Sequence, residues 1–238
     1  MIQENIQWDE IEMQKKFQVF LDKYGTKYMS DALHTIKENF GQNLERPPFD
    51  IMSQVYAALQ ALPEKYNYYN GVIEELEKTF GIDRHIVEIG GGMYPAFAEL
   101  VDQKQRKIKK GTITVYDPYL VPDKLGSIHL MKECFQMDTR LDNADLLVGL
   151  LPCQQTIPMV EKANHDHLEF YILMCGCTHF PNDYYMNYRP ITEADWHNYV
   201  YEVADRTKES TASLEVGYLP DQYEMPYPII KKKYKQKK

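Results

Sequence analysis

The sequence predicts an α/β protein in which an N-terminal helical region precedes a mostly parallel β-sheet that ends in a β-hairpin. Three observations support this fold class: helical spacing of apolar residues over the first 80 positions, a series of short apolar runs separated by helical or turn segments, and two β-patterned runs at the end. With 238 residues the chain can bury a sizeable core. We expect an N-terminal helical region over residues 1–80 and a sheet domain over residues 81–238.

The N-terminal region has a helical pattern from about residue 8 to residue 80. Within it, the pattern predicts helices over Ile51–Leu62 and Glu74–Phe80, with the tyrosine-rich residues 66–69 between them. We expect this region to pack on the sheet domain or to cover its ligand, although a purely structural helical cap fits the pattern equally well.

Near-continuous apolar runs are typical of parallel strands that are covered on both faces. Five such strands are expected, at residues 84–89, Thr112–Tyr116, Ile128–Phe135, Ala144–Leu151 and Leu168–Cys175.

The helices and the closing hairpin complete the expected order. Ile157–Ala163 predicts a short crossover helix, and a second helix begins at Thr192 with Trp196 in its buried stripe. The runs Leu214–Leu219 and Ile229–Tyr234, separated by a proline-rich turn, predict the hairpin.

The segment between the first two expected strands is the most informative about function. Gly90, Gly91 and Gly92 follow the first strand, Pro95 stands where the next helix begins, and Asp117 ends the second strand. Glycines allow a tight turn and a close approach of a ligand, and the start of the helix directs free N–H groups and partial positive charge toward it. An acid at the end of the second strand can bind ribose hydroxyls. The segment therefore predicts a nucleoside-cofactor site.

Two details disfavour a dinucleotide. The sixth position of the glycine pattern is Pro95 rather than glycine or alanine, and Glu88 places a carboxylate where a pyrophosphate would be repelled. Both details argue against NAD.

The pattern Glu-x-Gly-x-Gly after an apolar strand resembles the class I (Rossmann-like) S-adenosylmethionine-dependent methyltransferase superfamily, although Tyr94 replaces the usual third glycine. The resemblance implies a Rossmann-like sheet and S-adenosyl-L-methionine as cofactor. It also implies that the glycine turn borders the methionine part of the cofactor, that Asp117 holds the ribose, and that Asp138 accepts a hydrogen bond from the adenine amino group. The cofactor-binding residues it implies are Glu88, Gly90, Gly91, Gly92, Asp117 and Asp138.

The expected substrate pocket lies at the carboxyl end of the fourth strand, which faces the reacting group in open α/β sheets. Leu151 and Cys153 stand there, and an aromatic loop contributes Tyr184 and Tyr185. The triplet Pro-Cys-Gln around Cys153 resembles the nucleophilic motif of cytosine-C5 methyltransferases, but the other motifs of that family are missing. A packed, inert thiol is therefore the favoured interpretation, and DNA is not the expected substrate.

Cys175, Cys177 and His179 alternate after the fifth strand, and with Cys153 they could form a zinc site. Their spacing is not that of the usual zinc knuckles. Buried cysteines that close a core strand are the simpler interpretation, and we expect no metal.

Composition limits the partners and the compartment. A net charge of −8 argues against broad nucleic-acid affinity, and no apolar run is long enough to span a membrane. Four cysteines and a polar start without a secretory segment predict a reduced, cytoplasmic protein. Six lysines within residues 231–238 are interpreted as a solvated basic tail that ends the last strand.

The residues and the resemblance together predict an S-adenosylmethionine-dependent methyltransferase that acts on a small molecule by direct methyl transfer. The sequence leaves the methyl acceptor, the catalytic residues and the oligomeric state open. Gly90-x-Gly92-x-x-Pro95 after a helical region also resembles nicotianamine-synthase-type enzymes, which transfer the aminocarboxypropyl group of the same cofactor. A Rossmann-like binding module without catalytic activity is the third interpretation.

Overall fold

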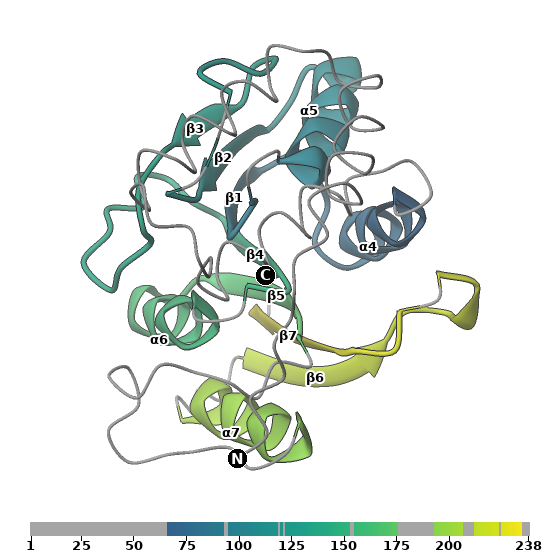
Figure 1. The fold of residues 1–238 in the computed structure, drawn as a ribbon, viewed down its shortest axis with the longest axis vertical. Coiled ribbons are helices and arrows are strands. Elements are labelled where there is room, and N and C mark those ends of the chain that lie inside the picture. The colour runs from purple at the N-terminus through teal and green to yellow at the C-terminus, as the bar shows by residue number, and fades with distance from the viewer. Residues whose placement is uncertain are drawn as a thin grey trace, which may run out of the picture.

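A computed structural model describes residues 66–92, 95–118, 120, 122–152, 155–175, 193–206, 212–223 and 225–234. Within these ranges the chain forms a seven-stranded sheet in the order β3-β2-β1-β4-β5-β7-β6, with helices on both faces (Figure 1). The strands are β1 (His85–Ile89), β2 (Thr112–Tyr116), β3 (His129–Met131), β4 (Leu146–Leu150), β5 (Glu169–Leu173), β6 (Ala212–Tyr218) and β7 (Pro228–Tyr234).

The sheet has the predicted mixture of strand directions. Neighbouring strands from β3 to β5 run parallel, whereas β7 is antiparallel to both β5 and β6. The predicted mostly parallel sheet with a terminal hairpin is therefore confirmed. β2 and β3 lie on one side of β1, and β4 and β5 lie on the other. The carboxyl ends of the parallel neighbours β1 and β4 therefore lie side by side at the point where the strand order reverses, which is where such sheets bind ligands.

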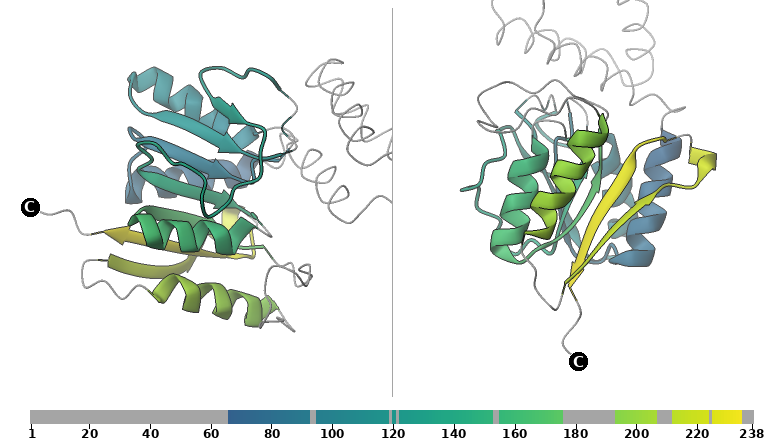
Figure 2. Two further views of the ribbon diagram at one scale, coloured as in Figure 1. Left: turned by 90° about the vertical axis from the view of Figure 1, so that its left-hand side faces the viewer. Right: turned by 90° about the horizontal axis from the view of Figure 1, so that it is seen from below.

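Four α-helices are described: α4 (Tyr66–Thr79), α5 (Ala96–Ile108), α6 (Thr156–Asp166) and α7 (Glu193–Asp205). α4 and α5 contribute to one hydrophobic cluster, and α6 and α7 contribute to the other. Figure 2 shows the two pairs on opposite faces of the sheet. Each face of the sheet therefore has its own hydrophobic core. The nearly fully buried strands β1, β4 and β5 contribute side chains to both cores.

The structure corrects the predicted start of the helix before β1. α4 begins at Tyr66, so the tyrosine-rich residues 66–69 lie inside the helix rather than between two helices. Tyr68, Val72 and Leu76 form a stripe that is buried against the sheet, and this packing extends the helix toward the N-terminus. The predicted helix over Ile51–Leu62 lies outside the described residues.

The third strand is shorter than predicted. It covers His129–Met131 instead of Ile128–Phe135, and Lys132, Glu133 and Cys134 after it are exposed. β3 is an outer strand whose paired neighbour is β2. The β2–β3 ladder is only three residues long, so the chain leaves the sheet after Met131.

The basic C-terminal segment is not entirely solvated, as it was predicted to be. Lys232 in β7 is 1% exposed, and its Nζ donates to Asn164 Oδ1 of α6 at 2.8 Å. Asn164 Nδ2 in turn donates to the carbonyl oxygen of Val203 in α7 at 2.9 Å. A buried cation requires such polar partners, and this chain of hydrogen bonds connects β7 with both helices of its face.

Candidate cofactor and substrate site

The glycine turn lies between β1 and α5, as predicted. Gly90 and Gly92 have φ values of +80° and +70°, a region that other residues rarely adopt. A Cβ on Gly91 would stand 2.5 Å from Val115 Cγ1, so the turn passes directly over β2. Pro95, which lacks an N–H, immediately precedes α5. The three glycines thus serve two needs, positive φ and close packing.

Asp117 holds this turn in place. Its Oδ2 accepts a hydrogen bond from the backbone N–H of Gly92 at 2.9 Å, and the residue is 8% exposed. The N–H of Gly90 donates to the carbonyl oxygen of Tyr116 at 2.9 Å, so the turn is tied to the end of β2 twice. The structure therefore brings the glycine turn and the acid of the second strand together, as the sequence predicted.

Glu88 lies beneath the turn on the α5 side of the sheet. It is 3% exposed, and its Oε2 has no hydrogen-bond partner among the described residues. The pKa of Glu88 is raised to about 8, chiefly by burial and in addition by the nearby Asp117 carboxylate, while a hydrogen bond from the backbone N–H of Ala98 opposes the rise. This places a proton-holding carboxyl with an unused oxygen beside the turn.

Two residues near these acids were missed by the sequence analysis. The buried Tyr68 of α4 has a raised pKa because of desolvation, with a hydrogen bond from Tyr69 opposing and the charge of Glu88 adding to the rise. Cys134, after β3, has its pKa raised by partial burial and then by Asp117. Cys134 could have been predicted because it follows a strand end. Tyr68 could not, because the sequence analysis placed the start of this helix after it.

The end of β4 meets the glycine turn. A Cβ built on Gly90 would lie 3.4 Å from the Cα of Pro152, so the two strand ends are in contact. Leu151 has a φ of +56°, which is strained for a leucine, and its N–H donates to the carbonyl oxygen of Leu173 at 2.9 Å. Leu151 is therefore where it was expected, beside the turn. The predicted Cys153, Tyr184 and Tyr185 lie outside the described residues.

Asp138 is exposed in a turn after β3, where the N–H of Thr139 donates to the carbonyl oxygen of Gln136. None of the contacts found among the described residues joins Asp138 to the glycine turn. Its role toward adenine therefore stays a prediction.

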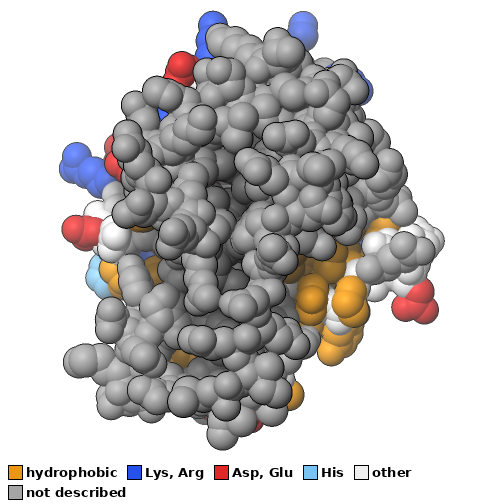
Figure 3. All heavy atoms as spheres, viewed as in Figure 1, with side chains coloured by type: hydrophobic (Ala, Val, Ile, Leu, Met, Phe, Trp, Pro, Cys, Tyr) orange, Lys and Arg blue, Asp and Glu red, His pale blue; other side chains and the backbone are white. Residues whose placement is uncertain are grey.

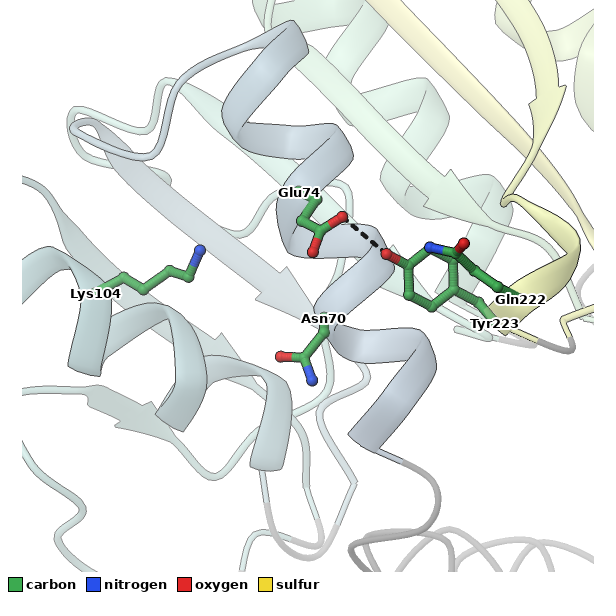
Figure 4. A pocket seen from close by; sticks show the side chains of 5 residues that line it. All are labelled: Asn70, Glu74, Lys104, Gln222 and Tyr223. Carbon is green, nitrogen blue, oxygen red and sulfur yellow. Dashed lines mark hydrogen bonds between the residues drawn. The ribbon is translucent and has the colours of Figure 1, made fainter.

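A separate open cavity of about 400 Å³ lies on the flank of the molecule, where α4, α5 and the 3₁₀ turn η3 (Asp221–Tyr223) meet. In Figure 4, Asn70, Lys104 and Gln222 surround it, and the hydroxyl of Tyr223 donates to Glu74 Oε2 at 2.8 Å. Its lining is polar, and none of the residues that the sequence analysis placed in the cofactor or substrate site belongs to it.

The described ranges contain no group of three or more metal-binding side chains close enough to hold an ion. Cys177 and His179 of the considered zinc site fall outside those ranges. No described helix is both long and apolar enough to cross a membrane.

No protein-family model and no curated protein matches the chain. Among solved structures, the plantazolicin methyltransferase BpumL, in complex with a monoazolic desmethylPZN analog and SAH, aligns with 95% of this chain and 100% of its own, with a TM-score of 0.53 and 10% identity. Human N-acetylserotonin methyltransferase, in complex with SAM, aligns with 94% of this chain and 71% of its own, with a TM-score of 0.49 and 13% identity. At these identities the likeness concerns the fold alone.

Proposed function

We propose, from the premise that the chain has the Rossmann-like fold of class I S-adenosylmethionine-dependent methyltransferases, that it binds S-adenosyl-L-methionine and transfers the methyl group to a small molecule. The observation that carries this proposal is the arrangement of Glu88, the glycine turn and Asp117 at the carboxyl edge of the sheet. A fold alone does not define a function, so the proposal depends on the chemistry of this site.

The residues present fit such a cofactor. The turn offers a surface free of side chains at Gly90 to Gly92, and the start of α5 lies next to it. In our proposal Asp117 accepts hydrogen bonds from the ribose hydroxyls. Glu88 offers its Oε2, which has no partner within the described residues, to the methionine part, whose positive charge would favour the ionised form of this carboxyl. The carboxyl groups of Glu88 and Asp117 beside the turn suit a cation better than a pyrophosphate.

Methyl transfer requires little of the protein beyond positioning the two reactants. When bound, the cofactor would supply an electrophilic methyl group on its sulfonium: an acceptor atom would bond to the methyl carbon, the carbon–sulfur bond would break, and S-adenosylhomocysteine would leave. Holding the two reactants in line provides most of the rate enhancement, which explains why the described residues need no obvious acid–base dyad. The strained Leu151, at the end of β4 beside the turn, is the described residue that we place against the acceptor. We propose Cys153, Tyr184 and Tyr185 as further parts of that pocket.

Isothermal titration calorimetry with S-adenosylmethionine, S-adenosylhomocysteine and NAD tests the cofactor. We expect the first two to bind and NAD not to bind. Asp117→Ala should weaken binding by about 1–3 kcal/mol, the loss expected when charge-assisted hydrogen bonds are removed. Asp117→Asn should lose less, because its amide oxygen can still accept a hydrogen bond from Gly92. Asp221→Ala, which removes an exposed carboxylate on η3, is the matched control and should bind normally.

Product analysis then identifies the reaction. The protein would be incubated with S-adenosylmethionine and a panel of small amines, hydroxyl compounds and heterocycles. Formation of S-adenosylhomocysteine supports methyl transfer. Methylthioadenosine would instead show aminocarboxypropyl transfer, and failure of both cofactor forms to bind would favour a module without catalytic activity.

A further inference from the structure

The outer edge of β6 has no pairing strand among the described residues. β6 is the last strand of the sheet and pairs with β7 through all seven of its residues without a bulge. No further partner for its backbone is found in the part of the chain that the structure describes. Figure 2, right, looks toward this edge, with α6 and α7 on one side of the hairpin and α4 on the other. Edge strands usually carry charged side chains, proline or a bulge that prevents pairing with another chain. β6 has no proline and no bulge, and its one charged residue, Glu215, is paired with Lys231 of β7.

Exposed apolar side chains are concentrated around this edge. Of the five large hydrophobic side chains that are exposed in the described ranges, three belong to β6 and α7: Val216 at 53%, Tyr218 at 65% and Tyr201 at 39%. α7 runs beside β6 in both figures. Hydrophobic side chains also gather between α4 and the β6–β7 hairpin on the face shown in Figure 3. Such a grouping is typical of a protein–protein contact rather than of a solvated edge.

We propose that β6 pairs with β6 of a second copy of this chain, antiparallel and about a two-fold axis perpendicular to the sheet at Val216. The result is a dimer in which the seven described strands of each copy join into one continuous sheet. This inference is independent of the proposed methyl transfer.

The sequence of β6 fits its own copy in this register. The axis places Val216 opposite Val216, and Leu214 opposite Tyr218, all on the face that carries α7. On the other face Glu215 lies opposite Gly217, where a side chain would find open space within its own chain. Glu215 also has a cation within its own chain, Lys231 at 3.3 Å, so no unpaired charge enters the interface.

The neighbouring register is disfavoured by charge. An axis at Glu215 would set two glutamates directly opposite each other, and like charges at opposite positions destabilise a strand pair. With a two-fold axis perpendicular to the sheet, both copies of β6 present the same face to the same side, so every possible register keeps each side chain on its own face. With the axis at Val216, the two α7 helices lie on the same face of the joined sheet, each with Tyr201 exposed.

Sedimentation equilibrium over a wide concentration range tests the dimer. We expect the wild-type chain to dimerise reversibly. Val216→Lys should raise the dimer dissociation constant by about tenfold or more, because it sets two lysines opposite each other on the axis. Ile108→Lys is the matched control: it also adds a lysine at an exposed apolar position, 48% exposed at the end of α5, and should leave the dissociation constant unchanged. A wild-type chain that stays monomeric, or a dimer that Val216→Lys leaves intact, would overturn the proposal.

Oxidative cross-linking tests the register. In a Cys134→Ser background, which removes an exposed thiol, Val216→Cys should form a disulfide-linked dimer, because directly opposite residues are close enough for a disulfide. Glu215→Cys should not, because its opposite residue is Gly217. Cross-linking through residue 215 and not residue 216 would overturn the register. Unchanged circular dichroism and urea midpoints of the variants at low concentration show that the monomer fold is retained.

Discussion

At the scale of single residues, Glu88 is the most unusual group in the described structure. A carboxyl that is 3% exposed keeps its proton more easily than a solvated one, and Asp117 nearby strengthens this preference. Such a perturbed acid at the edge of a cofactor-type fold is more typical of a binding site than of a purely structural position. It also makes the stability of the protein depend on pH in a direction that can be tested.

Between about pH 4.5 and pH 8, the folded protein holds a proton on Glu88 that the unfolded chain has released, since folding raises the pKa from 4.5 to about 8. The contribution of this proton to stability is therefore fully present below this window and falls as the pH rises through it. The slope is at most about 1.4 kcal/mol per pH unit. Glu88→Gln, which imitates the protonated form, should remove this slope and be more stable than wild type at the upper end. Urea unfolding of the ligand-free protein at several pH values measures both.

The control is Glu202→Gln, which changes an exposed carboxyl on α7 and should keep the wild-type slope. If Glu88→Gln and wild type lose stability in parallel with rising pH, the buried proton on Glu88 is ruled out.

Residue chemistry could be predicted from the sequence where local spacing determines it. Gly90, Gly92 and Asp117 were found because a glycine turn and a strand-end acid have fixed positions relative to a strand. The fixed spacing also identified Glu88. It could not show that Oε2 of Glu88 has no hydrogen-bond partner within the described residues, because that depends on packing. Tyr68 was missed because only the tertiary contact of α4 brings it near Glu88.

At the scale of elements, α4 depends on one glycine. A Cβ on Gly71 would lie 2.6 Å from Tyr223 Cδ2, so the absence of a side chain lets η3 pack on the helix. Tyr223 then reaches Glu74, and this contact joins α4 to the connection between β6 and β7. Local helix propensity is lower with glycine at this position, so packing has outweighed propensity.

A double-mutant cycle at this contact should show a change of sign. Gly71→Ala alone should destabilise the protein by about 1 kcal/mol or more, because the displaced ring costs more than the gain in helix propensity. In a Tyr223→Ala background the same change should stabilise it by up to about 1 kcal/mol, since the obstacle is gone. Urea unfolding of the four proteins measures both effects. An equal effect of Gly71→Ala in both backgrounds would mean that the ring does not press on the helix.

The order of elements was predicted correctly because strand and helix periodicities differ, but their ends were not. β3 ends early because it is an outer strand with a ladder of only three residues, and α4 starts early because its first turn packs on the sheet. Lys232, in an apparently solvated basic run, is buried because α6 offers Asn164 to it. Each of these outcomes depends on neighbours that are distant in sequence.

At the scale of the whole molecule, the two hydrophobic clusters share the central strands. β1, β4 and β5 contribute alternate residues to the α4–α5 face and to the α6–α7 face. We therefore expect the described part to unfold as one unit. A ligand at the carboxyl edge should then stabilise both faces equally, including Trp196, which is completely buried on α7.

This coupling can be measured with S-adenosylhomocysteine, provided that calorimetry has shown it to bind. At 100 times its dissociation constant the ligand should raise the free energy of unfolding by about 2.7 kcal/mol. In a Trp8→Phe variant, Trp196 is the remaining tryptophan. Its fluorescence should therefore report the α7 face, while far-ultraviolet circular dichroism reports the whole chain. We expect equal ligand-induced shifts of both urea transitions, and a much smaller shift for Asp117→Ala at the same ligand concentration. A fluorescence transition that does not respond to the ligand would show that the two faces unfold independently, because binding at the edge would then stabilise only the face with the glycine turn.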